Sequence, residues 1–250
     1  MRPEYIYPDR HDVLSAAMIR ATERSDEYWA AEERAVLDRL IGRIASMPGG
    51  RVRRMLDAGC GDGRLIPVFA PYAEVIVAID PDAGRVAAAR GRVTEAGLVE
   101  RVQLTCTTIE AFTTSEPFDI VLCSHIIQHV GTAAAQSILR ALARAVAPNG
   151  RVAILTARSP DGEDRFVRAE LVADRHGGAA TYREVPIDRA AFDALVSTQD
   201  GVLPIRFFAD ATLETLLHGA GLEIVDLASF HGDENAGDRD RYIEARRGGR

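Results

Sequence analysis

Acidic and glycine residues stand close together in the stretch 55–63, whose sequence is MLDAGCGDG. An apolar run ends there at Asp57, and three glycines then alternate with other residues. Glycine lets a backbone turn sharply and approach a ligand closely. This pattern predicts a ligand-binding loop at the carboxyl end of a buried strand. The residues expected to contact the ligand are Asp57, Gly59, Cys60 and Gly61.

The loop does not fit the dinucleotide-binding pattern G-x-G-x-x-G, because Arg64 occupies the place of its third glycine. A second acid, Asp80, ends the next apolar run and precedes Pro81. An acid at the end of a second strand can accept hydrogen bonds from both hydroxyls of a ribose. Asp-Pro pairs also open turns, so a purely structural aspartate is the alternative.

Two histidines, His125 and His129, follow a later apolar run that ends just before Ser124. Imidazoles titrate near neutral pH and can take a proton from a hydroxyl or an amine. Both are therefore candidate general bases, and His125 is nearer to the end of the strand. A structural role is the alternative for either residue, and His129 in particular could serve only to orient the loop.

Apolar runs and helical stretches alternate along the chain in a way that predicts the fold class. The expected strands are 54–58, 75–79, 102–106, 120–123, 152–156, 222–227 and 241–246. The expected helices are 65–72, 83–96, 133–147 and 210–220. Strand-helix-strand units at this spacing predict a Rossmann-like, doubly wound α/β fold. Its sheet should be mostly parallel, with about seven strands and helices on both faces.

Two segments lie outside this alternation. Residues 25–44 have the periodicity of an amphipathic helix, so we assign 1–48 to an N-terminal helical segment or lid. Residues 158–208 are long and rich in charge, with weak helical patches at 166–175 and 189–196. A structureless loop of this length is uncommon, so we expect a small helical substrate cap there. A solvated insertion without a role is the alternative, and 49–157 with 209–250 form the core.

Composition excludes several classes of function. Acidic residues outnumber basic ones by 37 to 30, giving a formal net charge of −7, so we expect no nucleic-acid partner. Every basic residue is arginine, which rules out Schiff-base chemistry and a phosphate-loop lysine. The sequence shows no long apolar run and no signal-peptide pattern, which favours a cytoplasmic protein without membrane contact. The three cysteines lack zinc-site spacing, so no metal is expected.

Over residues 50–156 and 207–246 the chain resembles the class I S-adenosylmethionine-dependent methyltransferases. The resemblance implies that Asp57 and the loop glycines hold the amino acid part of S-adenosylmethionine, and that Asp80 and Pro81 lie at its ribose. It aligns Thr108 and Ile109 with the residues that read the adenine, although the family usually has an acid in place of this threonine. Glu110 is the alternative if the register differs. Ser124 and the histidines would face the methionine part and the incoming nucleophile.

The resemblance therefore implies a methyltransferase of secondary metabolism that acts on a small molecule and releases S-adenosylhomocysteine. Methylation of oxygen is favoured over nitrogen or carbon, mainly by in-line positioning, with a histidine as a possible general base. The alternatives are an aminopropyl transferase or cyclase with the same cofactor fold, or a non-catalytic S-adenosylmethionine-binding regulatory module. We expect a monomer or homodimer.

Overall fold

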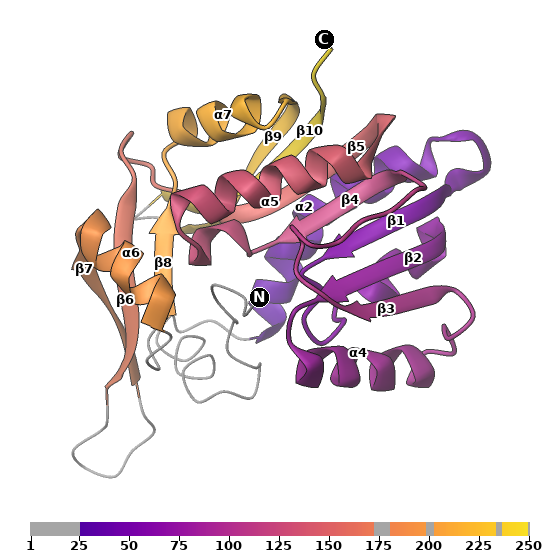
Figure 1. Ribbon diagram of the computed structural model, residues 1–250, viewed down its shortest axis with the longest axis horizontal. Coiled ribbons are helices and arrows are strands. Elements are labelled where there is room, and N and C mark those ends of the chain that lie inside the picture. Colours follow the sequence, from indigo (N-terminus) through magenta and orange to yellow (C-terminus); the bar gives the residue numbers. More distant parts are fainter. Residues whose placement is uncertain (1–25, 173–180, 199–202, 234–236, 250) are drawn as a thin grey trace.

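The computed structural model describes residues 26–172, 181–198, 203–233 and 237–249, which form two β-sheets and the helices around them (Figure 1). Within these ranges no helix is long and apolar enough to cross a membrane.

The larger sheet has seven strands in the order β3-β2-β1-β4-β5-β10-β9. Its strands are β1 (Val52–Ala58), β2 (Ala73–Asp80), β3 (Val102–Cys106), β4 (Phe118–Ser124), β5 (Val146–Ala157), β9 (Leu222–Asp233) and β10 (Gly237–Arg247). The five strands β1–β5 run parallel, whereas β10 is antiparallel to both of its neighbours. The predicted mostly parallel, seven-stranded sheet is thus confirmed. Parallel strands end at the same edge, so the residues after β1, β2 and β4 meet there.

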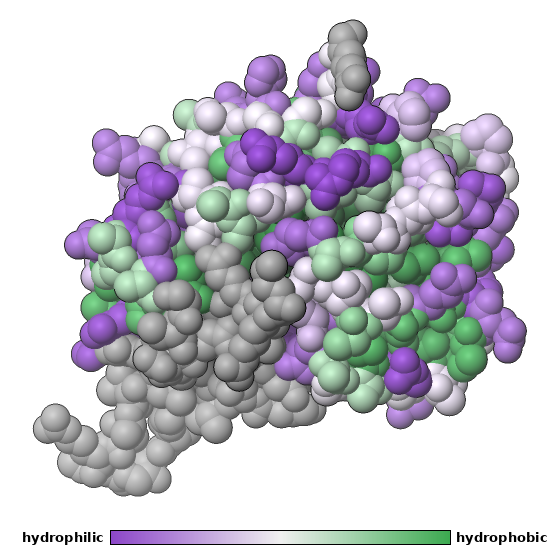
Figure 2. Space-filling model, viewed as in Figure 1, coloured by the Kyte–Doolittle hydropathy of each residue, from purple (hydrophilic) through white to green (hydrophobic). Residues whose placement is uncertain are grey.

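Helices cover both faces of this sheet. Helices α5 (Thr132–Ala145) and α7 (Asp210–Gly219) pack on one face, and α2 (Asp26–Ala45) and the short α3 (Ile66–Phe69) pack on the other. Helix α4 (Ala83–Glu95) lies beside β2 and β3. Single 3-10 turns are η1 (Pro48–Gly50), η2 (Ala70–Tyr72) and η3 (Ile127–His129). In Figure 2, hydrophilic residues lie over the outer side of α5, as expected for an amphipathic helix.

The central parallel strands β1, β2, β4 and β5 contain mainly apolar runs where both of their faces are buried. In β4, Ile120 and Leu122 face the cluster under α2, while Val121 and Cys123 face the cluster under α5. Strands buried on both faces lose the apolar-polar alternation of a half-exposed strand. This burial explains why such runs could be recognised in the sequence.

The insertion between β5 and α7 forms a second sheet, so the expectation of a mainly helical cap was wrong. Its antiparallel strands, in the order β7-β6-β8, are β6 (Arg165–Val172), β7 (Thr181–Ile187) and β8 (Leu203–Phe207). The expected helix at 166–175 is strand up to Val172, and its remaining residues lie outside the described ranges. The second helical patch is present as α6 (Arg189–Thr198), which packs against the sheet through Phe192 and Phe166, with ring centroids 5.1 Å apart.

A buried arginine joins the small sheet to the core. Arg206 on β8 is 3% exposed, pairs with Asp164, and donates to the Thr132 hydroxyl at 2.9 Å. Asp164 also accepts a hydrogen bond from the Ala209 amide at 2.8 Å. The Arg206 guanidinium lies 4.4 Å from the centre of the Phe208 ring. These contacts tie β8 to the starts of α5 and α7.

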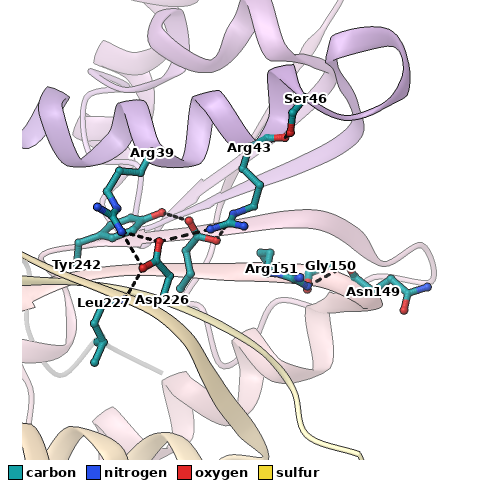
Figure 3. A network of polar contacts seen from close by, with 10 residues as sticks. Arg39, Arg43, Ser46, Asn149, Gly150, Arg151, Asp226, Leu227 and Tyr242 are labelled. Carbon is teal, nitrogen blue, oxygen red and sulfur yellow. Dashed lines mark hydrogen bonds and ion pairs between the residues drawn. The ribbon is translucent and has the colours of Figure 1, made fainter.

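Helix α2 is attached to the sheet by a second polar network (Figure 3). Glu244 on β10 is fully buried, and its carboxylate lies 2.7 Å from Arg43 of α2 and accepts from the Tyr242 hydroxyl at 2.7 Å. One turn earlier, Arg39 donates to Asp226 of β9 at 2.8 Å. A buried carboxylate needs such partners, so this network fixes the position of α2 on β9 and β10.

Candidate functional site

The loop after β1 has the backbone that its glycines predicted. Gly59, Gly61 and Gly63 have φ values of 82°, 54° and 79°, in the left-handed region that favours glycine. A Cβ atom on Gly59 would lie 2.6 Å from the Ile126 side chain, so the loop after β4 packs directly on this glycine. The amides of Gly59 and Cys60 both donate to the carbonyl of Ile79 on β2, at 2.8 and 2.9 Å. The glycine loop is thereby held between β2 and the histidine-containing loop.

Asp80 is buried at the end of β2 and organises the turn around it. Its carboxylate accepts from the Gly61 amide and from the Asp82 amide, both at 2.9 Å. Burial raises the pKa of Asp80, and these two backbone donors oppose that rise. Each carboxylate oxygen keeps a second lone pair that can accept from a ligand hydroxyl. Pro81 is half-buried next to it.

Asp57 is buried at the end of β1 beside this turn. Burial raises its pKa to about 7, helped by the charges of Asp80 and Glu33 and opposed by that of Arg64. Within the described part of the chain, no donor forms a hydrogen bond to its carboxylate. A buried carboxylate without a donor is costly, and a bound cation would relieve that cost.

The structure adds Glu33 and Arg64 to the site, which sequence reasoning had not assigned. Glu33 on α2 is 5% exposed, receives two hydrogen bonds from the Arg64 guanidinium, and accepts from the Ser124 hydroxyl at 3.2 Å. Although burial raises the pKa of Glu33, the hydrogen bond and charge of Arg64 lower it overall. Only the position of Arg64 next to the glycines signalled this pair, because Glu33 is one of several acids on its helix.

The two histidines occupy different environments. His125 directly follows β4 and is the only non-glycine residue with positive φ, at 54°, among the residues described. Its amide donates to the Leu155 carbonyl at 2.8 Å, and its half-buried ring couples electrostatically to Glu33. His129 is 2% exposed and its Nδ1 lies 2.8 Å from the Pro204 carbonyl. Burial lowers the pKa of His129 to about 3, so it is neutral at physiological pH.

The segment after β3 approaches the same edge of the sheet. The amide of Thr107 donates to the Asp80 carbonyl at 3.0 Å, which places this segment beside the second acid. The half-buried Thr108 hydroxyl accepts from the Ala111 amide at 3.2 Å, and Ile109 packs in the core cluster under α5. Glu110 is exposed.

The charges of the site favour a cation. Asp57, Asp80 and Glu33 are buried acids, and Arg64 is the basic residue that pairs with one of them. Such an excess of negative charge repels phosphate and attracts a positively charged ligand. No group of three or more His, Cys, Asp or Glu side chains in the described ranges is arranged to hold a metal ion.

Comparison with known proteins identifies the domain. Residues 55–150 match the family model described as a methyltransferase domain. The chain is 37% identical over 103 residues to the ubiquinone biosynthesis O-methyltransferase of Rhodopseudomonas palustris (strain HaA2), covering 41% of this chain and 39% of that protein. It is 30% identical over 152 residues to the protein of the same name from Salmonella arizonae (strain ATCC BAA-731 / CDC346-86 / RSK2980), covering 58% and 62%. The chain thus spans about two fifths of the length of the first of these curated relatives.

A solved structure extends the similarity of the fold to nearly the whole chain. The glycopeptide N-methyltransferase MtfA, complexed with S-adenosylmethionine, has a TM-score of 0.64 at 17% identity, covering 98% of this chain and 93% of that one. At this identity the similarity concerns the fold, whereas the match over 55–150 concerns the sequence of the domain. Residues 55–150 therefore match a methyltransferase domain in sequence, and the chain as a whole shares the fold of this methyltransferase.

Proposed function

We propose that this chain is an S-adenosylmethionine-dependent methyltransferase that methylates a small molecule and releases S-adenosylhomocysteine. The observation that carries the proposal is the pair of buried acids, Asp57 and Asp80, on either side of the glycine loop inside the matched domain. S-adenosylmethionine carries a sulfonium and an ammonium but no phosphate, so an acidic site suits it.

The residues present fit this cofactor. Asp57 would pair with the ammonium group, which supplies the donor that its buried carboxylate lacks within the described residues. Asp80 would accept the ribose hydroxyls with Pro81 beside it, and the backbone at Gly59, Cys60 and Gly61 would line the amino acid part. Thr108 and Ile109 are proposed for the adenine and Ser124 for the methionine end.

Bound S-adenosylmethionine supplies the methyl group in activated form, and holding the acceptor in line with it can provide much of the rate enhancement. The protein then has to orient the acceptor and remove its proton. We assign proton removal to His125, because it follows β4 directly and lies within the electrostatic reach of Glu33. Burial and a low pKa favour a structural role for His129.

A hydroxyl is the proposed acceptor group, supported by the names of the curated relatives. The similar fold of an N-methyltransferase makes an amine the second choice to test. The insertion with β6, β7 and β8 is the proposed cover for an enclosed substrate. Cytoplasmic location, a role in secondary metabolism, the absence of a nucleic-acid partner, and a monomeric or homodimeric state stay predictions.

The first test is calorimetric titration with S-adenosylmethionine and S-adenosylhomocysteine, using wild-type protein, Asp80→Ala, and Asp38→Ala as control. Asp38 is an exposed acid on α2 that pairs with Arg34. We expect micromolar binding that Asp80→Ala weakens more than about tenfold, roughly 1.4 kcal/mol, and that Asp38→Ala leaves unchanged. Equal binding by all three proteins, or none by the wild type, would contradict the assigned site.

Turnover is the second test. Formation of S-adenosylhomocysteine with panels of phenols, alcohols and amines separates the two acceptor types. Cofactor binding without turnover on any panel would favour the non-catalytic module, and formation of methylthioadenosine from decarboxylated S-adenosylmethionine would favour an aminopropyl transferase. His125→Asn should lower kcat by about 10²- to 10⁴-fold without weakening S-adenosylhomocysteine binding. Asparagine is chosen because it tolerates the left-handed backbone of this position.

A further inference from the structure

Gln128 is a buried glutamine whose side chain lies between His125 and the end of β5. It belongs to η3 and is 8% exposed. Its Oε1 atom accepts a hydrogen bond from the Ala157 amide at 2.7 Å and lies 3.3 Å from Nδ1 of His125.

These two contacts determine where His125 carries its proton. The Ala157 amide can only donate, so the side-chain atom facing it must be the amide oxygen of Gln128 rather than its nitrogen. That oxygen can only accept, so the contact with His125 is a hydrogen bond only if Nδ1 is protonated. The neutral ring must then have its lone pair on Nε2.

Ala157 and His125, the two residues that contact the Gln128 side chain, are both held by the large sheet. Ala157 pairs with Asp240 of β10, and its carbonyl accepts from the Phe208 amide at 3.1 Å. The His125 amide donates to the Leu155 carbonyl on the same strand, two residues before Ala157. The imidazole also packs against Phe230 in a T-shaped arrangement, with ring centroids 6.2 Å apart. The imidazole is therefore fixed from its backbone and from Nδ1, and among the residues described no hydrogen bond to its Nε2 is formed.

We propose that Gln128 is a positioning residue that holds His125 in the Nδ1–H tautomer, so that Nε2 accepts the proton of the substrate hydroxyl. This inference rests on the proposed methyltransferase function. The hydroxyl proton moves to Nε2 as the oxygen gains the methyl group, and the methyl donor keeps the electrons of its broken bond. The resulting imidazolium lies near the Glu33 carboxylate and later returns its proton to water.

Glutamine substitutions separate this role from general packing. Gln128→Leu removes the acceptor, whereas Gln128→Glu keeps an oxygen facing both Ala157 and His125. Gln136→Leu is the matched control, because Gln136 on α5 donates to the Leu216 carbonyl on α7 instead. His125→Asn identifies the His125 signals among those of the six histidines.

The main readout is the nitrogen-15 spectrum of the imidazoles at about pH 8.5, where a typical histidine is neutral. Wild type, Gln128→Glu and Gln136→Leu should have protonated Nδ1 and bare Nε2 at His125. Gln128→Leu should populate the opposite tautomer and lose about 10- to 100-fold in kcat, as other supporting hydrogen-bond partners do. Its affinity for S-adenosylhomocysteine should not change.

An Nε2–H tautomer in the wild type would overturn the proposal even if Gln128→Leu did not fold. So would an unchanged tautomer or unchanged kcat in Gln128→Leu. A protein with the expected tautomers but no turnover on any acceptor would refute the proposed function, and with it the catalytic role of Gln128. In that case the Nδ1–H assignment would still hold as a structural result, which keeps the two failures distinguishable.

Discussion

Asp57 is a buried acid of the site whose ionisation should couple to cofactor binding. Its carboxylate is buried at the end of β1 and next to the acids Asp80 and Glu33, and its pKa is raised to about 7. In the free protein near neutral pH, Asp57 is therefore partly protonated. An ammonium group placed against it would favour the ionised form and lower its pKa.

Cofactor binding should consequently release a proton. Between about pH 6 and 7, Asp57 loses its proton when the ammonium arrives, so affinity for S-adenosylmethionine should rise with pH across this range. Titration calorimetry in two buffers of different ionisation enthalpy measures the number of protons released. Asp57→Asn should bind more weakly and release fewer. Equal proton release by the wild type and the variant would show that another group is responsible.

The glycine loop permits a test that separates backbone strain from close packing. Gly59 and Gly49 both have φ of 82°, but a Cβ on Gly59 meets Ile126 at 2.6 Å, whereas one on Gly49 meets nothing within 4 Å. Gly49→Ala should cost about 1–2 kcal/mol for its backbone alone. Gly59→Ala should cost about 1–3 kcal/mol more and weaken S-adenosylhomocysteine binding. Urea unfolding and calorimetry would measure both, and equal losses would contradict the close contact.

At the scale of elements, the strands of the larger sheet could be predicted because short apolar runs alternate with helical stretches along the chain. The second sheet escaped prediction for two reasons. In β6, Phe166, Ala169 and Val172 recur every third residue and imitate a helix. Its partners β7 and β8 come later in the chain, and their pairing leaves no local signal.

The site residues also fall into a group that could be predicted from the sequence and a group that could not. Asp57, the glycines and Asp80 follow one another along two neighbouring strands, so a local motif is enough to find them. Glu33 contacts Arg64 from α2, which precedes β1 in the chain. Gln128 contacts Ala157 at the end of β5, although α5 and the rest of β5 separate the two residues in the sequence. Tertiary packing alone creates these contacts.

The attachment of the small sheet to the core depends on Arg206. Replacing it with methionine leaves Asp164 without its cation, and breaking a buried pair of this kind costs about 3–5 kcal/mol. Arg246→Met, which removes an exposed pair with Glu223, should cost less than about 1 kcal/mol. Hydrogen exchange should show β6 and β8 opening in the Arg206 variant and protected in the control. Uniform loss of protection over both sheets would mean that they unfold as one unit.

At the scale of the whole molecule, the buried side chains of His129 and Asp57 have opposite effects on how the stability of the folded protein changes with pH. The folded state lowers the pKa of His129 to about 3, so the unfolded state alone takes up this proton as pH falls below about 6.5. That uptake destabilises the folded protein in acid. Asp57 acts in the opposite direction, because its raised pKa makes the folded state lose stability as pH rises from about 4 to 7.

Between about pH 4 and 6.5 the two contributions cancel, each changing the free energy of unfolding by about 1.4 kcal/mol per pH unit. Removing one of the two titrating groups should make the contribution of the remaining group measurable. His129→Asn keeps a donor for the Pro204 carbonyl but no longer titrates, so its stability relative to wild type should improve as pH falls through this range. Asp57→Asn should show the reverse trend. Urea unfolding at several pH values measures the difference in the free energy of unfolding between each variant and the wild type. The contributions of the other titrating groups largely cancel in these differences. Parallel trends in the two variants would contradict the assignment.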